Sequence, residues 1–294
     1  MTADAATKLR SGKGSGDENF PVASWLLARE HRQPILAFYE FVRVADDIAD
    51  HPDLRPEEKL QHLDALERSL LGRDDGESVG VRLRAALAAR NLSPQHAQDL
   101  LHAFRQDVTK LRYDDWDDLI GYCRYSAMPV GRFVLDVHGE SRATWPASDK
   151  VCSALQIINH LQDCVKDLNA LDRCYIPLDG LKAARTKVES LRDLRASPEM
   201  LGVLHGLAKR TSVMLEQGAM LPAQIADRRL SLEIAAIVHL ARHFLRRLRE
   251  RDPLSENVRL GKFGVAAVGL HGAMQGLFQR LGRGPSAVSG SPAE

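Results

Sequence analysis

Two groups of polar residues have a spacing that could hold a divalent cation. Asp46 and Asp50 are one helical turn apart, and Asn159, Asp163 and Asp167 follow one another at the same interval. A single Asp-x-x-x-Asp pair is typical of a solvated helix face, because like charges at this interval cost an isolated helix only about 0.5 kcal/mol or less. Two such stripes facing each other across a core would repel, so together they indicate a cation between them.

The donor atoms select the kind of cation. They are all oxygens, and the eleven histidines show no metal-ligand spacing, which favours a hard cation, Mg²⁺ before Ca²⁺. Mg²⁺ usually takes one or two protein carboxylates and completes its shell with water and substrate phosphate. We therefore expect a diphosphate held between two helices, where metal and arginine would neutralise the departing group and promote its ionisation.

Other polar residues extend the two stripes. Tyr39 and Arg43 precede Asp46 on the first stripe, and Gln156 precedes Asn159 on the second. Each stripe lies beside apolar residues of helical period, which predicts that both stripes border a core. A polar pocket between two packed helices follows from this arrangement.

A third segment, YCRYSAMPVG, contains Tyr122 and Tyr125. Pro129 should kink this helix or free the carbonyl of Tyr125, and Gly121 and Gly131 would permit close helix approach. A kinked core helix with buried tyrosines is one interpretation. The carboxylate stripes favour a pocket wall instead, because aromatic faces stabilise a cation such as diphosphate loss would create.

These residues must be positioned by helices, since apolar residues recur with period 3.6 and strand signals are essentially missing. The predicted fold is all-α. Pro34 is placed in the first turn of the helix that carries Asp46, and Pro52 closes that helix. Ser93 and Ser197, each followed by proline, are predicted N-caps. Further helices are predicted over residues 56–71, 79–90, 94–110, 116–138, 147–168, 198–218, 231–250 and 261–281.

Composition argues against several function classes. The 294 residues carry 40 Lys and Arg against 39 Asp and Glu, a formal net charge of +1, so no nucleic-acid partner is expected. No apolar run reaches about 18 residues, and no GxGxxG follows a strand, so neither a membrane span nor an NADPH-dependent step is expected. Four scattered cysteines and no signal peptide are typical of a cytoplasmic protein.

A basic stripe is formed by Arg242, Arg246 and Arg249. A solvated helix face is the default interpretation of such a stripe. The alternative is a peripheral contact with the anionic inner face of the cell membrane, which attracts basic residues at about 1 kcal/mol per charge.

Four motifs in this order resemble the squalene/phytoene synthase family of head-to-head prenyl synthases. They are the aspartate pair at 46–50, the segment YCRYSAMPVG, the stretch NHLQDCVKD, and RCYIP at 173–177. The resemblance covers residues 18–281 and implies a single domain, the class I isoprenoid synthase helical bundle with a central cavity. Residues 1–17 and 282–294 are expected to form a flexible N-terminal segment and a flexible tail.

The resemblance also implies roles for individual residues. As metal ligands it implies Asp46, Asp50, Asn159, Asp163 and Asp167. The same four aspartates would be catalytic, together with Tyr125, which would face the carbocation. The substrate-binding residues that it implies are Asn19, Tyr39, Arg43, Tyr122, Gln156, Asn159, Arg173 and Tyr175.

The stretches SGKGSGDENFPVAS and AFYEFVRVADDIADHPDL are similar to a bacterial branch of the family that acts in hopanoid biosynthesis. This resemblance implies Mg²⁺-dependent conversion of presqualene diphosphate to hydroxysqualene, in which diphosphate leaves, the carbocation rearranges and water traps it. It also implies two pathway partners, a presqualene diphosphate synthase and a squalene-forming reductase. The alternative is condensation of two farnesyl or geranylgeranyl diphosphates to presqualene diphosphate, squalene, dehydrosqualene or phytoene.

Two departures from the family pattern bear on that choice. Many relatives have Arg immediately before the first Asp of the second motif, whereas this chain has Gln162. One cation fewer favours a substrate with a single diphosphate. Residues 126–129 read SAMP where relatives often have Val-Ala-Gly, a change that could admit water near the cation.

Two more distant hypotheses remain. A class I terpene cyclase would share the spacing of Asn159, Asp163 and Asp167 and would turn over one farnesyl diphosphate alone. A non-catalytic helical module would instead use its acidic stripes to bind a basic helix of a partner.

Overall fold

The structure is a computed structural model that describes residues 28–261, 264–265, 268–269 and 272. The predicted flexible ends at 1–17 and 282–294, the candidate substrate contact Asn19, and most of the helix predicted over 261–281 lie outside these residues.

The described part of the chain contains helices and no strand, as the periodicity predicted. Its α-helices and 3₁₀ helices are α1 (Arg29–Ala49), α2 (Pro56–Leu70), α3 (Ser78–Ala88), α4 (Gln95–Thr109), α5 (Trp116–Ser126), α6 (Met128–Val137), η3 (Arg142–Thr144), α7 (Trp145–Leu171), α8 (Leu178–Ala183), η4 (Val188–Arg192), α9 (Pro198–Gly218), α10 (Leu221–Gln224) and α11 (Arg228–Glu250). No described helix is long and apolar enough to cross a membrane.

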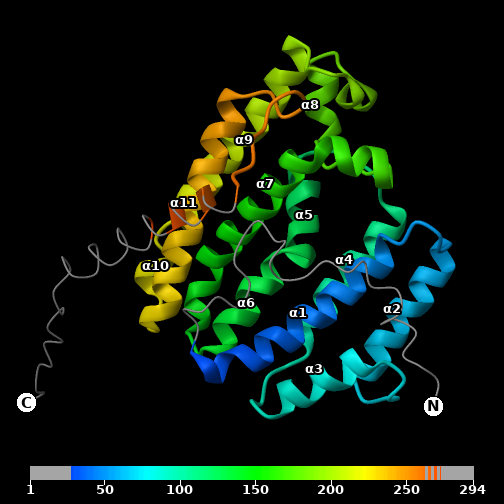
Figure 1. Ribbon diagram of the computed structural model, residues 1–294, viewed down its shortest axis with the longest axis vertical. Coiled ribbons are helices and arrows are strands. Elements are labelled where there is room, and N and C mark those ends of the chain that lie inside the picture. The colour runs from blue at the N-terminus through cyan, green and yellow to red at the C-terminus, as the bar shows by residue number, and fades with distance from the viewer. Residues whose placement is uncertain (1–27, 262–263, 266–267, 270–271, 273–294) are drawn as a thin grey trace, which may run out of the picture.

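Two groups of helices surround a shared core. Helix α1 packs against α2, α3 and α4, and α7 packs against α5, α9 and α11. Helix α6 contacts both α1 and α7 and so joins the groups. Figure 1 shows α9 and α11 beside α7, on the side away from α2 and α3. Fully buried residues such as Phe41, Ile48 and Leu161 form the core between them.

Helix α1 begins earlier than the sequence predicted. It starts at Arg29, so Pro34 lies inside the helix and not in its first turn. Proline has no N–H to donate to the carbonyl one turn back. The Arg90 side chain donates to that carbonyl, at Glu30, which satisfies the acceptor that Pro34 leaves open. The helix ends at Ala49, before Pro52.

The helix predicted over 116–138 is two helices. The chain breaks at Ala127, whose φ of −130° departs from helical geometry, and Pro129 lies in the first turn of α6. Of the two glycines expected at close approaches, Gly131 is confirmed, because a Cβ there would lie 2.4 Å from Ser148 Oγ on α7. The close approach expected at Gly121 is wrong, because no atom lies within 4 Å of a Cβ placed at that exposed position.

One of the two predicted serine caps is confirmed: Ser197 is the N-cap of α9, whereas α4 begins at Gln95 with Pro94 as its N-cap, so Ser93 lies one residue before the cap. Ser197 accepts a hydrogen bond from the Met200 N–H at 3.2 Å, and Ser93 accepts one from the Gln95 N–H at 3.2 Å. These side-chain acceptors satisfy N–H groups that have no partner inside the helix. Ser197 therefore sets where α9 begins.

Candidate functional site

The first aspartate pair lies at the carboxyl end of α1. Asp46 is in its last turn and Asp50 is its C-cap residue, with no basic residue of α1 nearby in that turn. Carboxylates are unfavourable here because the helix dipole places partial negative charge at this end. Positive groups offset the cost: Arg43 pairs with Asp46 at 3.0 Å, and Lys59 of α2 donates to the Ala49 carbonyl at 2.9 Å.

The segment that follows α7 places a third positive group beside this pair. Asp172 takes a left-handed conformation with φ of 50°, which turns the chain out of the helix. The Cys174 N–H then donates to the Leu111 carbonyl and the Leu178 N–H to the Tyr113 carbonyl, both at 2.9 Å. Residues 173–177 are thereby held in an extended conformation against 111–114.

This geometry directs Arg173 into the protein. Its Nη1 lies 2.7 Å from Oδ1 of Asp50, and its Nε donates to the Asp107 carbonyl at 3.2 Å. The Arg173 side chain is only 7% exposed. Arg173, which the family resemblance implied as a substrate contact, therefore forms an ion pair with Asp50, which the resemblance implied as a metal ligand.

Asp107 of α4 is a part of the site that sequence reasoning missed. It is buried, and Tyr122 donates its hydroxyl to Oδ2 at 2.9 Å. Burial and the nearby carboxylate of Asp50 raise its pKa to about 7, against the opposing effect of Arg173. A signal was available: Asp107 follows Leu100 and Ala103 at the intervals of a buried helix face, where an acid is costly without partners.

The second stripe lies along α7. Asn159 and Gln156 are half-buried on the same helix as Asp163 and Asp167. Asp163 forms an ion pair with Arg259, which comes from beyond the end of α11. Burial, together with repulsion from Asp50, raises the pKa of Asp167 to about 6. Arg173, two residues beyond the end of α7, pairs with Asp50 at the end of α1, so these two helix ends lie close together.

The acids outnumber the cations at this place among the described residues. Burial and repulsion from Asp50 raise the pKa of Asp46 to about 7 in spite of Arg43. Arg43 also contacts Asp47 at 2.9 Å, so its charge is shared between two carboxylates. A cluster of oxygen donors with raised pKa values is one that a hard divalent cation would stabilise.

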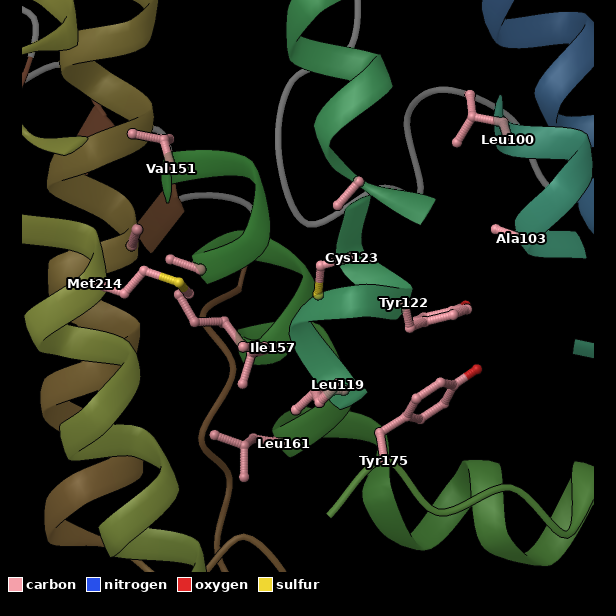
Figure 2. Packing of buried hydrophobic residues seen from close by; sticks show 14 of the residues in the cluster. Leu100, Ala103, Leu119, Tyr122, Cys123, Val151, Ile157, Leu161, Tyr175 and Met214 are labelled. Atoms are coloured by element: carbon pink, nitrogen blue, oxygen red, sulfur yellow. The ribbon is translucent and has the colours of Figure 1, made fainter. Parts of the chain in front are cut away.

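The tyrosines divide into two environments. Tyr122, Tyr175 and Tyr113 form a buried cluster in which Tyr175 stacks on His160 at 3.5 Å between ring centroids. Figure 2 shows the hydroxyls of Tyr122 and Tyr175 pointing to one side, away from the aliphatic packing around Leu161. Burial lowers the pKa of His160 to about 3, so this ring is a neutral packing partner.

Tyr125 is placed differently from that cluster. It is half-buried at the end of α5, and its ring lies 4.3 Å from that of His102 on α4. The structure thus separates the implied aromatic residues: Tyr122 and Tyr175 support Asp107 and Arg173, whereas Tyr125 remains partly open.

An apolar cavity of about 270 Å³ adjoins the acidic cluster. It lies between α1, α6, α7 and α11, with Val42, Val134 and Leu155 among its lining residues. Tyr39, an implied substrate contact, lines it as well. Because Asp46 follows Val42 and Asn159 follows Leu155 by one turn, the cavity and the acidic cluster use the same faces of α1 and α7.

Comparison with known proteins agrees with this geometry. The chain is 55% identical over 285 residues to a hydroxysqualene synthase of Rhodopseudomonas palustris, covering 96% of this chain and 97% of that protein. It is 52% identical to a hydroxysqualene synthase of Sinorhizobium fredii, covering 94% of each chain. Phytoene synthases are more distant, for example that of Mycobacterium tuberculosis, at 37% identity over 55% of this chain and 54% of that protein.

Solved structures share the helical fold. A dehydrosqualene synthase in complex with a ligand superposes with a TM-score of 0.78 at 20% identity, covering 93% of this chain and 96% of that one. Squalene synthase HpnC of Alicyclobacillus acidocaldarius does so with a TM-score of 0.66 at 28% identity, covering 92% and 93%. The squalene/phytoene synthase family model matches residues 14–263. The chain therefore belongs to the squalene/phytoene synthase family.

Proposed function

We propose that this chain converts presqualene diphosphate to hydroxysqualene, with release of diphosphate and dependence on Mg²⁺. The observation that carries the proposal is that the apolar cavity and the acidic cluster occupy neighbouring turns on the same faces of α1 and α7. A diphosphate head group and a hydrocarbon chain need these two environments side by side. The high identity to hydroxysqualene synthases over nearly the full chain supports the same reaction.

Mg²⁺ would be held by Asp46 and Asp50 on α1 and by Asn159, Asp163 and Asp167 on α7. The donor set fits, because it consists of oxygens from two helices whose carboxylates repel one another. When bound, Mg²⁺ supplies charge neutralisation for the leaving diphosphate. Asp163 would exchange its contact with Arg259 for the metal.

The protein's own residues would divide the remaining work. Arg43 at the cluster would contact the diphosphate, with Tyr39 and Gln156 along the pocket. The C–O bond to the diphosphate breaks with its electron pair leaving on oxygen, and the rearranged cation takes up water and loses a proton. Tyr125, with its ring partly open, would face the cation, which an aromatic face stabilises. The apolar lining excludes bulk water from the hydrocarbon.

The roles of Tyr122, Arg173 and Tyr175 are proposed to be supporting ones. Arg173 holds Asp50 at 2.7 Å, and Tyr122 hydrogen-bonds Asp107. These contacts would keep the ligand carboxylates in place before the substrate arrives.

Product analysis tests the reaction. Purified full-length protein with Mg²⁺ and presqualene diphosphate should release hydroxysqualene and one diphosphate, and Asp46→Asn or Asp163→Asn should reduce turnover by at least about 100-fold. Asp75→Asn is the matched control, because Asp75 is 74% exposed and pairs with Arg84 away from the site. Products formed from farnesyl or geranylgeranyl diphosphate alone would identify the condensation reaction in place of this one.

We also propose that the protein contacts the membrane surface peripherally and takes up its hydrophobic substrate there. On α11, Arg246 and Arg249 are exposed, whereas Arg242 is paired with Glu216 at 2.6 Å. In a flotation assay, the protein should rise together with vesicles that contain anionic lipid. The double variant Arg246→Glu/Arg249→Glu should no longer bind these vesicles. A presqualene diphosphate synthase and a squalene-forming reductase are the proposed pathway partners that supply the substrate and consume the product.

A further inference from the structure

A group of metal-ligating side chains lies at the opposite end of the cavity from the aspartates. His31 near the start of α1, His138 at the end of α6 and Asp227 just before α11 each offer one ligand atom, and these atoms all lie within 4.8 Å of one another. The three residues are far apart in the sequence, so no spacing pattern could have revealed them.

His138 is held with one nitrogen ready to bind. It is the C-cap of α6, where Gly139 with φ of 69° and a Glu140 N–H bond to the Leu135 carbonyl at 3.0 Å end the helix. Nδ1 of His138 lies 2.8 Å from the Val134 carbonyl, and a carbonyl can only accept, so Nδ1 carries the proton. The lone pair is therefore on Nε2.

His31 faces His138 and has an unsatisfied nitrogen. The two ring centroids are 4.1 Å apart. The His31 side chain is 13% exposed, and its Nδ1 is buried with no hydrogen-bond partner among the described residues. A buried ring nitrogen of this kind costs free energy unless a proton donor or a metal satisfies it.

Asp227 supplies the negative charge from a fixed position. Its Oδ1 accepts from the N–H groups of Arg229 at 2.7 Å and Leu230 at 3.0 Å, which caps α11 and leaves Oδ2 for another partner. Glu140 accepts from the Ala226 and Asp227 N–H groups at 2.9 and 2.8 Å, which holds the preceding loop. Hydrogen bonds with the surrounding backbone thus fix the positions of His138 and Asp227, and His31 lies in the first turn of α1.

We propose that His31, His138 and Asp227 form a Zn²⁺ site that joins α1, α6 and α11 at the end of the apolar cavity. Two imidazoles and one carboxylate make a set of three protein ligands for a tetrahedral Zn²⁺ with a fourth position for water. Mg²⁺ would not compete, because it prefers oxygen donors.

The position of the site gives it a structural consequence. Each ligand lies one helical turn from a cavity-lining residue: His31 from Ile35, His138 from Val134 and Asp227 from Leu230. His31 is roughly 22 Å along α1 from Asp46, at 1.5 Å of rise per residue. The metal would therefore hold α1, α6 and α11 together beside the cavity without taking part in the chemistry at the aspartates.

Zinc titration of the untagged full-length protein tests this proposal. With excess Mg²⁺ present to occupy the aspartates, calorimetry should show one equivalent of Zn²⁺ bound, and Co²⁺ in its place should give the intense visible bands of a tetrahedral site. His31→Gln, His138→Gln and Asp227→Asn should each weaken Zn²⁺ binding by at least about 100-fold. Asp227→Asn retains an oxygen that can cap α11, so it should fold even if a histidine variant does not.

Two control variants make the result specific. His62→Gln on α2 and Asp163→Asn in the acidic cluster should leave the bound equivalent and the Co²⁺ spectrum unchanged. The proposal is overturned if no zinc binds, if binding is the same in His31→Gln and Asp227→Asn as in the unaltered protein, or if Asp163→Asn removes it. Because the readout is metal binding, it is independent of whether the reaction proposed above is correct.

Discussion

Arg173 lies with its Nη1 2.7 Å from Oδ1 of Asp50, and this contact joins the segment after α7 to the end of α1. Both motifs were visible in the sequence, but their pairing was not. The contact means that the two halves of the acidic cluster share a buried cation before any metal binds.

Removing Arg173 should destabilise the fold. Arg173→Gln leaves Asp50 and the buried Asp107 without their cation, and the loss should be about 2 kcal/mol, less than for a fully buried pair because the Asp50 side chain is 36% exposed. The free energy of unfolding from urea denaturation measures this loss. Arg82→Gln is the matched control, because its pair with Glu40 is exposed and should be worth about 0.5 kcal/mol. Equal losses in the two variants would contradict a special role for Arg173.

Asp46 should make the metal-free protein less stable as pH rises. Its pKa is raised from 3.8 to about 7 in the folded state, so the folded state binds the proton more tightly than the unfolded state does. The resulting stabilisation is fully present below about pH 4 and is lost as pH rises through about 7. Asp46→Asn removes this dependence, because the amide resembles the protonated acid.

The comparison is best made in chelator at pH 5 and pH 8. The difference in unfolding free energy, variant minus unaltered protein, should become more positive between these pH values. We expect a change on the order of 1 kcal/mol, reduced by solvent screening because the Asp46 side chain is 38% exposed. Asp75→Asn, on an exposed side chain, should show no such trend. A difference that does not change with pH would be inconsistent with the raised pKa.

Mg²⁺ with pyrophosphate should raise the melting temperature, and more so at pH 7.5 than at pH 5.5. Ligand that binds the folded state stabilises it by mass action, and the carboxylates must lose their protons first. The raised pKa values of Asp46 and Asp167, about 7 and 6, place that change in this range. Asp163→Asn should abolish the shift. A helical interaction module without a metal site would show no shift at either pH.

Gly131→Ala should destabilise the protein and alter the cavity wall. A Cβ at this position would clash with Ser148 Oγ and Cys152 Sγ, so these two side chains must rotate away or α6 must move away from α7. Overpacking of this kind costs about 1–3 kcal/mol. Gly121→Ala provides the opposite control: nothing lies within 4 Å there, and alanine should stabilise α5 by about 0.5–1 kcal/mol. Thermal unfolding of the two variants should therefore shift in opposite directions.

Helix periodicity predicted most of the fold, and the exceptions have local causes. Helix α9 begins at Pro198 and ends at Gly218 as predicted, because Ser197 supplies an unambiguous cap. The predicted start of α1 was wrong because proline is common in the first turn of a helix. The donor that compensates for Pro34, Arg90, lies in a distant part of the chain. The break at Ala127 appeared as a kink because apolar residues continue in helical register across it.

The all-helical class, the two acidic stripes and the family could all be recognised from the order of the residues alone. Each of these features depends on residues of one type that recur at intervals of three and four. Such intervals place the side chains on one face of a helix, whatever that helix packs against. The apolar residues beside the stripes likewise indicated that both would border a core.

Which helix faces contact one another became known from the folded chain. It brought Asp107 and Arg173 to the acidic cluster, aligned the cavity with it, and assembled His31, His138 and Asp227 at the other end. The physical reason is that contacts between helices depend on how loops and packing orient them, and a one-dimensional period carries no information about the partner. A lone histidine in each of two helices therefore has no metal signature until the chain folds.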